Sequence, residues 1–173
     1  VREEILNANG SIVVSASAGS GKTTIMIKKI IKKLTEITNH KTVAAITFTV
    51  KATEEIKKKA AEKGNIQNFV VMTNDSFIEY EIIRPFLQDA FGDEFSDSFV
   101  ISYDRTGKSS SFDGGMNILR RDNKLRTYHD NKKNFKFELA KRILEQSQAA
   151  QEYLKSKYIT LFLDEYQDSD MDM

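Results

Sequence analysis

The sequence has no cysteine, one proline and eight glycines among its 173 residues. Without cysteine, a disulfide scaffold, a cysteine-ligated zinc site and a thiol nucleophile are excluded. The low proline and glycine content excludes collagen-like and low-complexity linker proteins. No apolar run approaches the ~20 residues that a membrane-spanning helix needs, and the charged residues 1–4 are unlike a signal peptide. These absences predict a cytoplasmic protein with no membrane partner.

Neither sign of charge is in excess, because 26 Lys and Arg oppose 25 Asp and Glu and leave a formal net charge of +1. Any nucleic-acid contact must therefore come from a local patch. The length predicts one domain, or one domain with an insertion, with room for a hydrophobic core. Because the chain begins with Val1 and not with Met, we expect it to be a cut or processed piece.

Short apolar, β-branched runs predict four strands, at residues 12–14, 43–46, 69–72 and 159–163. The first of these runs leads directly into a glycine-containing loop. Helical periodicity separates the runs and predicts helices around residues 22–34, 52–60, 77–90 and 135–154. We expect Pro85 to kink its helix or to end its first part, because proline cannot donate to the carbonyl of Glu81.

The helix after the glycine loop has a clear apolar face, formed by Ile27, Ile30, Ile31 and Leu34. Four lysines share its other face, where we expect them to be solvated: Lys28, Lys29, Lys32 and Lys33. Residues 93–135 interrupt the alternation and are predicted to have little regular structure. The pattern as a whole predicts an α/β fold with a parallel sheet flanked by helices. Residues 1–92 and 156–173 would form the main domain, and residues 93–155 an insertion.

Residues 16–23 (A-S-A-G-S-G-K-T) match the P-loop pattern G-x-x-x-x-G-K-[ST], with Ala16 in the first glycine position. Gly19 and Gly21 let backbone N–H groups surround phosphate oxygens at a helix N-terminus. Lys22 would reach the β and γ phosphates, and the Thr23 hydroxyl would bind Mg²⁺. The plainer alternative is a Gly/Ser turn that happens to contain Lys-Thr.

Asp164 and Glu165 follow the last apolar run, at the end where a P-loop protein handles its metal ion and attacking water. Asp164 would hold Mg²⁺ and Glu165 would act as the general base. The alternative is a solvated loop after a core strand. Beside a P-loop, this pair predicts a nucleoside triphosphatase that uses Mg²⁺.

Four segments resemble, in order, the motifs of the UvrD-like superfamily 1 helicases. Residues 164–168 (D-E-Y-Q-D) resemble motif II, and residues 16–23 resemble motif I. Residues 46–52 (I-T-F-T-V-K-A) resemble motif Ia, and residues 73–77 (T-N-D-S-F) stand where the family has T-x-H-S-F. The resemblance implies a RecA-like P-loop domain with a 1B-like insertion, from an ATP-dependent DNA helicase or translocase that uses a second RecA-like domain.

The family's site residues transfer to matching positions of this chain. The residues implied in nucleotide binding are Glu4, Ala18, Gly19, Ser20, Gly21, Lys22, Thr23 and Thr24. Those implied in catalysis are Lys22, Glu165 and Gln167, the last of which would couple the nucleotide state to the partner domain. Thr23 and Asp164 are implied as the Mg²⁺ ligands.

Single-stranded DNA or strand ends would, by the same resemblance, follow a path along Thr47, Phe48, Thr49, Lys51, Thr73 and Asn74. An aromatic ring for stacking beside hydroxyls and a cation suits such a path. An equally good interpretation is a core phenylalanine beside a helix cap at Thr49. The basic segment 120–136 is a further DNA-binding candidate, although a solvated polar loop explains it better.

Several positions depart from the family pattern. Val50 and Thr53 replace Asn and Ala of motif Ia, and Asp75 replaces a His that lies beside the nucleic acid. Glu4 stands in the place of the adenine-reading Gln, and an ionised Glu accepts hydrogen bonds without donating any. The motifs III to VI have no counterpart here, so we expect this piece alone to bind nucleotide weakly and hardly to hydrolyse it.

Residues 74–77, 81–86, 133–137 and 164–170 show a narrower likeness, to the UvrD-like helicase subunits of Gabija anti-phage systems. That resemblance implies a defence complex with an OLD-family nuclease as partner. It also raises a second hypothesis, a nucleotide-sensing interaction module that docks to and regulates the nuclease with little unwinding. A small-molecule kinase is a third and weaker alternative.

Overall fold

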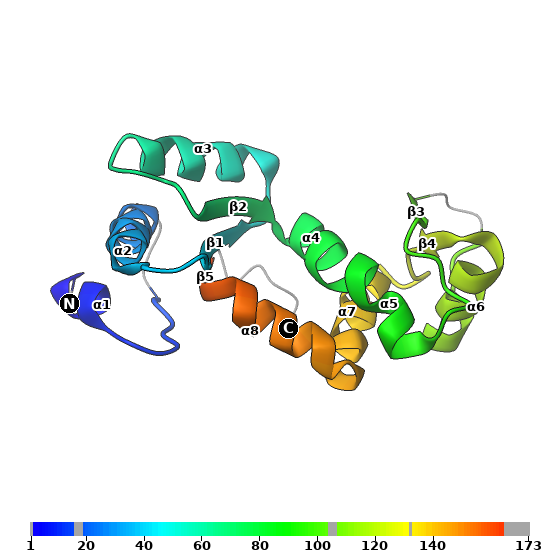
Figure 1. The fold of residues 1–173 in the computed structure, drawn as a ribbon. Helices are drawn as coiled ribbons and strands as arrows, with labels where there is room; N and C mark the ends of the chain where they lie inside the picture. The colour runs from blue at the N-terminus through cyan, green and yellow to red at the C-terminus, as the bar shows by residue number, and fades with distance from the viewer. Residues whose placement is uncertain (1, 16–18, 104–106, 132, 165–173) are drawn as a thin grey trace. The chain divides into compact units, whose positions relative to one another are not determined.

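The computed structural model describes residues 2–15, 19–103, 107–131 and 133–164. Their contacts divide into two compact units, which are treated separately below. Unit 1 takes in the described residues of Val1–Asn74 and Ser156–Gln167, and unit 2 those of Asp75–Lys155. Figure 1 shows the elements of both.

Unit 1 is built on a three-stranded parallel sheet with the order β2-β1-β5. Its strands are β1 (Thr42–Thr47), β2 (Phe69–Thr73) and β5 (Tyr158–Leu163). β1 lies in the middle, and its Ile46 is opposite Met72 on one side and Leu163 on the other. The parallel sheet predicted from the alternating pattern is therefore confirmed, as are three of its four predicted strands.

Three helices belong to unit 1: α1 (Arg2–Asn7), α2 (Lys22–Glu36) and α3 (Val50–Ala61). The apolar faces of α2 and α3 pack together with one face of the sheet (Figure 1). The buried side chains of this core are Ile27, Ile30, Val43, Ala45, Ile56, Ala60 and Phe69. This packing confirms the apolar face predicted for the first long helix, and it holds the start of α2 in a defined place beside the sheet.

The predicted strand at residues 12–14 is wrong. These residues form no strand, and Ile12 and Val13 are 41% and 80% exposed. β-branched residues favour an extended backbone, but a strand also needs a neighbour whose N–H and C=O groups complete its ladder. Among the described residues, the sheet of unit 1 consists of β2, β1 and β5 alone.

Unit 2 begins with three helical segments in succession: α4 (Asn74–Phe77, whose first residue belongs to unit 1), the π-helix η1 (Ile78–Ile83) and α5 (Arg84–Phe91). Pro85 stands in the first turn of α5, where a missing N–H is tolerated. The π-helix ends at Ile83, but Ile83 and Arg84 keep right-handed helical angles, so the chain stays helical up to this proline and the predicted break is not seen. The unit also contains α6 (Phe112–Asp122), α7 (Phe135–Gln146) and nearly all of α8 (Gln148–Lys157).

The segment 93–135 has more regular structure than predicted. It contains α6 and a parallel pair of short strands, β3 (Val100–Ser102) and β4 (Lys124–Arg126). Aromatic rings organise it, because Phe112 and Tyr128 both contact Phe135, with ring centroids 5.6 and 5.4 Å apart. Local polar composition concealed this small core, which depends on rings far apart in the sequence.

The single helix predicted over residues 135–154 is two helices, α7 and α8. Ser147 leaves the helical conformation between them and is buried, and its hydroxyl accepts a hydrogen bond from the Ala150 N–H at 2.9 Å. Such a cap starts a new helix and competes with continuation of the first. None of the helices in the described part of the chain is long and apolar enough to span a membrane.

Candidate functional site

The described part of the loop before α2 contains two glycines in a conformation typical of anion-binding loops. Gly19 and Gly21 have φ angles of +76° and +87°, in the left-handed region that favours glycine. A Cβ atom on Gly19 would meet nothing within 4 Å, so the backbone conformation and not crowding calls for glycine there. Gly21 is the N-cap of α2 and makes no side-chain capping bond, which leaves the first turn of the helix to bind an anion.

Lys22, Thr23 and Thr24 form the first turn of α2, directly after this glycine loop. Lys22 and Thr23 are half-buried, whereas Thr24 is exposed. Ser20 is also exposed, and Ala18 lies outside the described residues. Residues 19–24 are the predicted phosphate-binding residues in this described region, and they lie together at the start of α2.

A cavity of about 230 Å³ lies between α1 and the start of α2. Its lining residues are Arg2, Leu6, Gly19, Ser20, Gly21, Thr24, Ile25 and Lys28. Arg2 connects the α1 side of the cavity with the glycine loop, because the Nη2 atom of Arg2 donates a hydrogen bond to the Ser20 carbonyl at 3.4 Å. Glu4, the residue predicted to read the base, is exposed on α1 and is not among the lining residues. Sequence reasoning missed Arg2 and Leu6, which no pattern in the first ten residues singles out.

Lys29 is buried, which contradicts the solvated position predicted from the lysine face of α2. It is only 7% exposed, and its Nζ donates to the carbonyl oxygens of Ile5 at 2.6 Å and Ala8 at 2.7 Å. Burial lowers the pKa of Lys29, and the nearby charges of Lys33 and Lys32 lower it further. The prediction failed because α1 covers this position, and helical periodicity carries no information about a second helix.

The carboxyl ends of the three strands of unit 1 meet at one edge of the sheet. Thr47 of β1 is opposite Thr73 of β2, and the Asp164 N–H donates to the Ile46 carbonyl at 2.9 Å. The predicted metal ligand Asp164 is thus aligned with residues of both predicted DNA-binding segments. Ligands of open parallel sheets bind at this edge. The predicted residues Glu165 and Gln167 lie outside the described part of the chain.

The predicted ligands Thr23 and Asp164 suit Mg²⁺ by their chemistry, since a hydroxyl and a carboxylate are the oxygen donors that this ion prefers. The described residues contain no group of three or more His, Asp or Glu side chains that could hold a metal.

The segment after β1 combines a buried and an exposed part. Thr47 is 1% exposed and its hydroxyl donates to the Thr49 carbonyl at 3.1 Å, so its side chain supports the turn. The Thr49 hydroxyl accepts from the Ala52 N–H at 3.1 Å and caps α3, as the helix-cap interpretation predicted. Phe48, at 41% exposure, and Lys51 remain accessible. Of the predicted DNA-binding residues in this turn, Phe48 and Lys51 therefore have side chains that solvent can reach, as does the neighbouring Val50, at 65% exposure.

The other predicted DNA-binding residues are less accessible. Thr73 is half-buried and Asn74 is buried, at the end of β2. Within unit 2, the carboxylate of Asp75 accepts a hydrogen bond from the Lys136 Nζ at 2.7 Å. Lys136 is 5% exposed, so this member of the basic segment 120–136 is unavailable to a phosphate. Arg121, by contrast, is exposed and pairs with the neighbouring Asp122.

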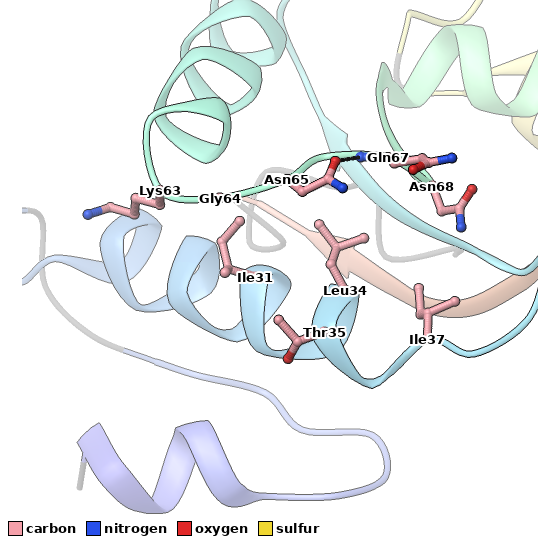
Figure 2. Close-up of a pocket in the computed structure, with 9 residues that line it drawn as sticks. All are labelled: Ile31, Leu34, Thr35, Ile37, Lys63, Gly64, Asn65, Gln67 and Asn68. Atoms are coloured by element: carbon pink, nitrogen blue, oxygen red, sulfur yellow. Dashed lines mark hydrogen bonds between the residues drawn. The ribbon is translucent and has the colours of Figure 1, made fainter.

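A second cavity, of about 410 Å³, lies between the end of α2 and the loop that joins α3 to β2 (Figure 2). Its lining residues are Ile31, Leu34, Thr35, Ile37, Lys63, Gly64, Asn65, Gln67 and Asn68. In Figure 2 Ile31 and Leu34 rise from α2 toward the loop, while Lys63 extends away from it. None of the predicted site residues lines this cavity, so its larger volume does not make it the nucleotide site.

Comparison with known proteins assigns this chain a clear set of relatives. Residues 1–141 match the family described as the UvrD/REP helicase N-terminal domain. The chain is 48% identical over 174 residues to the Gabija protein GajB of Bacillus cereus, an alignment that covers 99% of this chain and 34% of that relative. It is also 41% identical over 73 residues to an ATP-dependent helicase/nuclease protein of Streptococcus uberis, covering 42% of this chain and 6% of that relative.

A similar helicase/nuclease protein from Streptococcus mutans is 39% identical over 77 residues, which are 44% of this chain and 6% of that protein. The chain therefore spans about a third of the length of the GajB relative, and the aligned parts span only a small fraction of the two streptococcal proteins.

Proposed function

This chain belongs to the UvrD/REP helicase N-terminal domain family, and from that premise we propose that it is the ATP-binding part of a DNA helicase or translocase. In this proposal unit 1 is a RecA-like P-loop domain, and unit 2 contains the 1B-like insertion. The complete protein couples ATP hydrolysis to movement on DNA.

The observation that carries the proposal is the left-handed pair Gly19 and Gly21 at the uncapped start of α2, beside a cavity that α1 closes. The N–H groups of this turn and the positive end of the helix dipole favour a phosphate group. In this proposal the Lys22 side chain neutralises phosphate charge. A turn that contained Lys-Thr by chance would need neither the paired glycine conformations nor the adjoining cavity.

The remaining residues have complementary roles. The Thr23 hydroxyl and the Asp164 carboxylate would hold Mg²⁺, and the bound ion would supply positive charge beside the phosphate oxygens. Glu165 accepts the proton of the attacking water, and Gln167 links the nucleotide to the second RecA-like domain of the complete protein. Closure of the two domains around ATP, and their release after hydrolysis, would step the protein along a strand.

On the DNA side, we propose that Phe48 stacks on a base and that Lys51 binds a phosphate. Both are exposed just after the central strand of the sheet. Thr47 and Thr49 shape this turn through their internal hydrogen bonds, and Thr73 and Asn74 shape the neighbouring one. Movement of the turn with the nucleotide state would transmit hydrolysis to the strand.

A defence role follows from the relative named Gabija protein GajB, to which nearly the whole chain aligns. We propose that the complete protein acts within an anti-phage Gabija complex, with an OLD-family nuclease as its partner. The names of the streptococcal relatives likewise join helicase and nuclease functions in those proteins.

One observation favours the alternative of a nucleotide-sensing module. Of the residues expected along the DNA path, Thr47 and Asn74 are buried, and Asp75 presents a half-exposed carboxylate where the family has a His. A carboxylate at this position favours a phosphate backbone less than a His would, even though Lys136 pairs with it. In the alternative, nucleotide binding controls the nuclease partner and unwinding is minor.

ATP turnover of the complete protein, measured with and without single-stranded DNA, tests the two functions. We expect DNA to stimulate turnover, Lys22→Ala and Glu165→Gln to abolish it, and Lys51→Ala to weaken the stimulation. Lys57→Ala is a matched control, because Lys57 is another exposed lysine of α3. Turnover that is unchanged by DNA but changes when the nuclease is added would support the sensing module. The absence of ATP binding would refute both proposed functions.

A further inference from the structure

We infer that Lys29 is a positioning residue for nucleotide recognition, which holds α1 against the P-loop helix so that Arg2 and Leu6 line the cavity. This inference rests on the proposed function, because it assigns the cavity to the base and ribose of the nucleotide. Figure 1 shows α1 beside α2, the helix that carries Lys29.

The short helix α1 needs an external partner to stay in place. It has six residues, and isolated helices shorter than about 12–15 residues are marginal in water. The last carbonyl groups of a helix have no partner within the helix, and they favour a cation. The Lys29 Nζ supplies that cation, since it donates to the carbonyls of Ile5 and Ala8.

Two further contacts link α1 to the rest of unit 1. The Lys32 Nζ donates to the Asn7 side chain at 2.8 Å, and the Arg2 guanidinium donates to the Ser20 carbonyl at 3.4 Å. Both are exposed to solvent, so water competes with them. The hydrogen bonds of Lys29 are partly buried, and they place an ammonium group on the backbone itself. We therefore expect the position of α1 to depend more on Lys29 than on either of these two contacts.

The contact of Lys29 with α1 affects only one of two parts of the proposed nucleotide site. The phosphate-binding groups belong to the glycine loop and to α2, which is packed into the core of unit 1 through Ile27 and Ile30. The opposite wall of the cavity comes from Arg2 and Leu6 of α1. Releasing α1 should therefore weaken recognition of the base and ribose while the phosphate-binding turn stays intact.

The test compares two ligands, ATP and inorganic tripolyphosphate, each with Mg²⁺, by calorimetry on the complete protein. In the wild type we expect ATP to bind more tightly than tripolyphosphate. Lys29→Met keeps the length of the side chain but removes its charge and donors. We expect it to weaken ATP binding about tenfold or more, and to leave tripolyphosphate binding within about twofold.

Two further variants serve as controls. Lys29→Arg should restore most of the ATP affinity, because a guanidinium can also donate to two carbonyls. Lys33→Met should change nothing, because Lys33 lies on the same helix but pairs with Glu36. Hydrogen exchange provides a readout without ligand: in Lys29→Met, the amides of residues 5–8 should lose protection while those of residues 25–34 keep it.

Each other outcome is decisive. Lys29→Met that binds ATP normally, or that loses both ligands together, overturns the positioning role. A wild type that binds both ligands equally also overturns it, while leaving the P-loop function in place. A wild type that binds neither ligand refutes the proposed ATP-binding function itself.

Discussion

Two buried lysines, one in each unit, are held in opposite ways. Lys29 in unit 1 is 7% exposed and donates to two neutral carbonyl oxygens of α1 and the residue after it. Lys136 in unit 2 is 5% exposed and donates to two carboxylates, those of Asp75 at 2.7 Å and Glu79 at 2.9 Å. Both lie in lysine-rich stretches that look alike in sequence.

The difference lies in what remains when the lysine is removed. Without Lys29, the carbonyls of Ile5 and Ala8 belong to a short surface helix that can move away and find water. Without Lys136, Glu79 stays buried inside the π-helix η1, with Arg84 as its other hydrogen-bond donor. A buried charge that loses its partner is more costly than a surface helix that loses a cap. The first lysine therefore controls a local position, and the second the stability of its whole unit.

The largest effect is expected from Lys136→Met, which should destabilise unit 2 by about 3–5 kcal/mol because it leaves Glu79 undercompensated. The loss of hydrogen-exchange protection in η1 and α7 measures it. Lys133→Met, at an exposed lysine nearby, should stay within about 0.5 kcal/mol of the wild type. Adding Glu79→Gln to Lys136→Met should recover part of the loss, and independent, additive effects would contradict the pairing.

Lys29→Met should have an intermediate effect confined to α1, of about 1.5–3 kcal/mol, because hydrogen bonds from a charged donor are lost at a partly solvated site. Exchange of the Ala8 amide, which donates to the Glu4 carbonyl, reports this opening directly. If the sheet of unit 1 lost protection to the same extent, the two lysines would not differ as described.

Low pH should distinguish the two lysine sites, because Lys136 donates to carboxylates, which acid can protonate, and Lys29 donates to carbonyls. Burial alone would raise the pKa of Glu79, but hydrogen bonds from Lys136 and Arg84 and their charges lower it overall. A carboxylate whose pKa is lowered by folding stabilises the fold above its unfolded pKa, about 4.3, and this contribution is lost as the pH falls through the folded pKa.

We therefore expect unit 2 to lose stability below about pH 4, by about 1.4 kcal/mol per unit of difference between the two pKa values. Glu79→Gln should make this loss shallower when exchange protection is followed between about pH 6 and pH 3. Glu138 should still contribute to the loss of stability in acid, because folding lowers its pKa as well. Burial raises the pKa of Glu138, but hydrogen bonds from Tyr128 and Arg142 lower it overall. An unchanged pH profile in the variant would show that Glu79 is not part of the acid response.

The smallest effect is expected from Asp75→Asn, which should change the stability of unit 2 by less than about 1 kcal/mol. Its bond to Lys136 is the shorter of the two, yet its side chain is 54% exposed, against 8% for Glu79. Thermal unfolding of the complete protein compares Asp75→Asn with Glu79→Gln. Equal losses would show that distance, and not burial, sets the strength of these pairs.

Local patterns in the sequence predicted the elements on which the site is built. The apolar face of α2 and the parallel strands β1, β2 and β5 are confirmed. The glycine loop adopts the left-handed conformations that its motif requires at Gly19 and Gly21. These succeed because periodicity, β-branched runs and glycine conformations depend on residues close together in the chain.

The wrong predictions have two kinds of cause. The run at residues 12–14 has strand composition but no described strand partner, and the aromatic core around Phe135 was concealed in a polar stretch. Both outcomes depended on groups that the local pattern does not contain. The helix expected over 135–154 ends where Ser147 caps its successor, which is a local signal that helical periodicity alone does not register.

The sequence by itself determined the family, the parallel α/β pattern and the left-handed glycines before α2, because each depends on short stretches of neighbouring residues. Only the tertiary structure decided that Lys29 holds α1, that Lys136 neutralises Glu79, and that Thr47 is buried beneath its turn. The physical reason is that a lysine's surroundings are set by what packs over it. A helix pattern shows which face is apolar, but not which carbonyl or carboxylate will cover the other face.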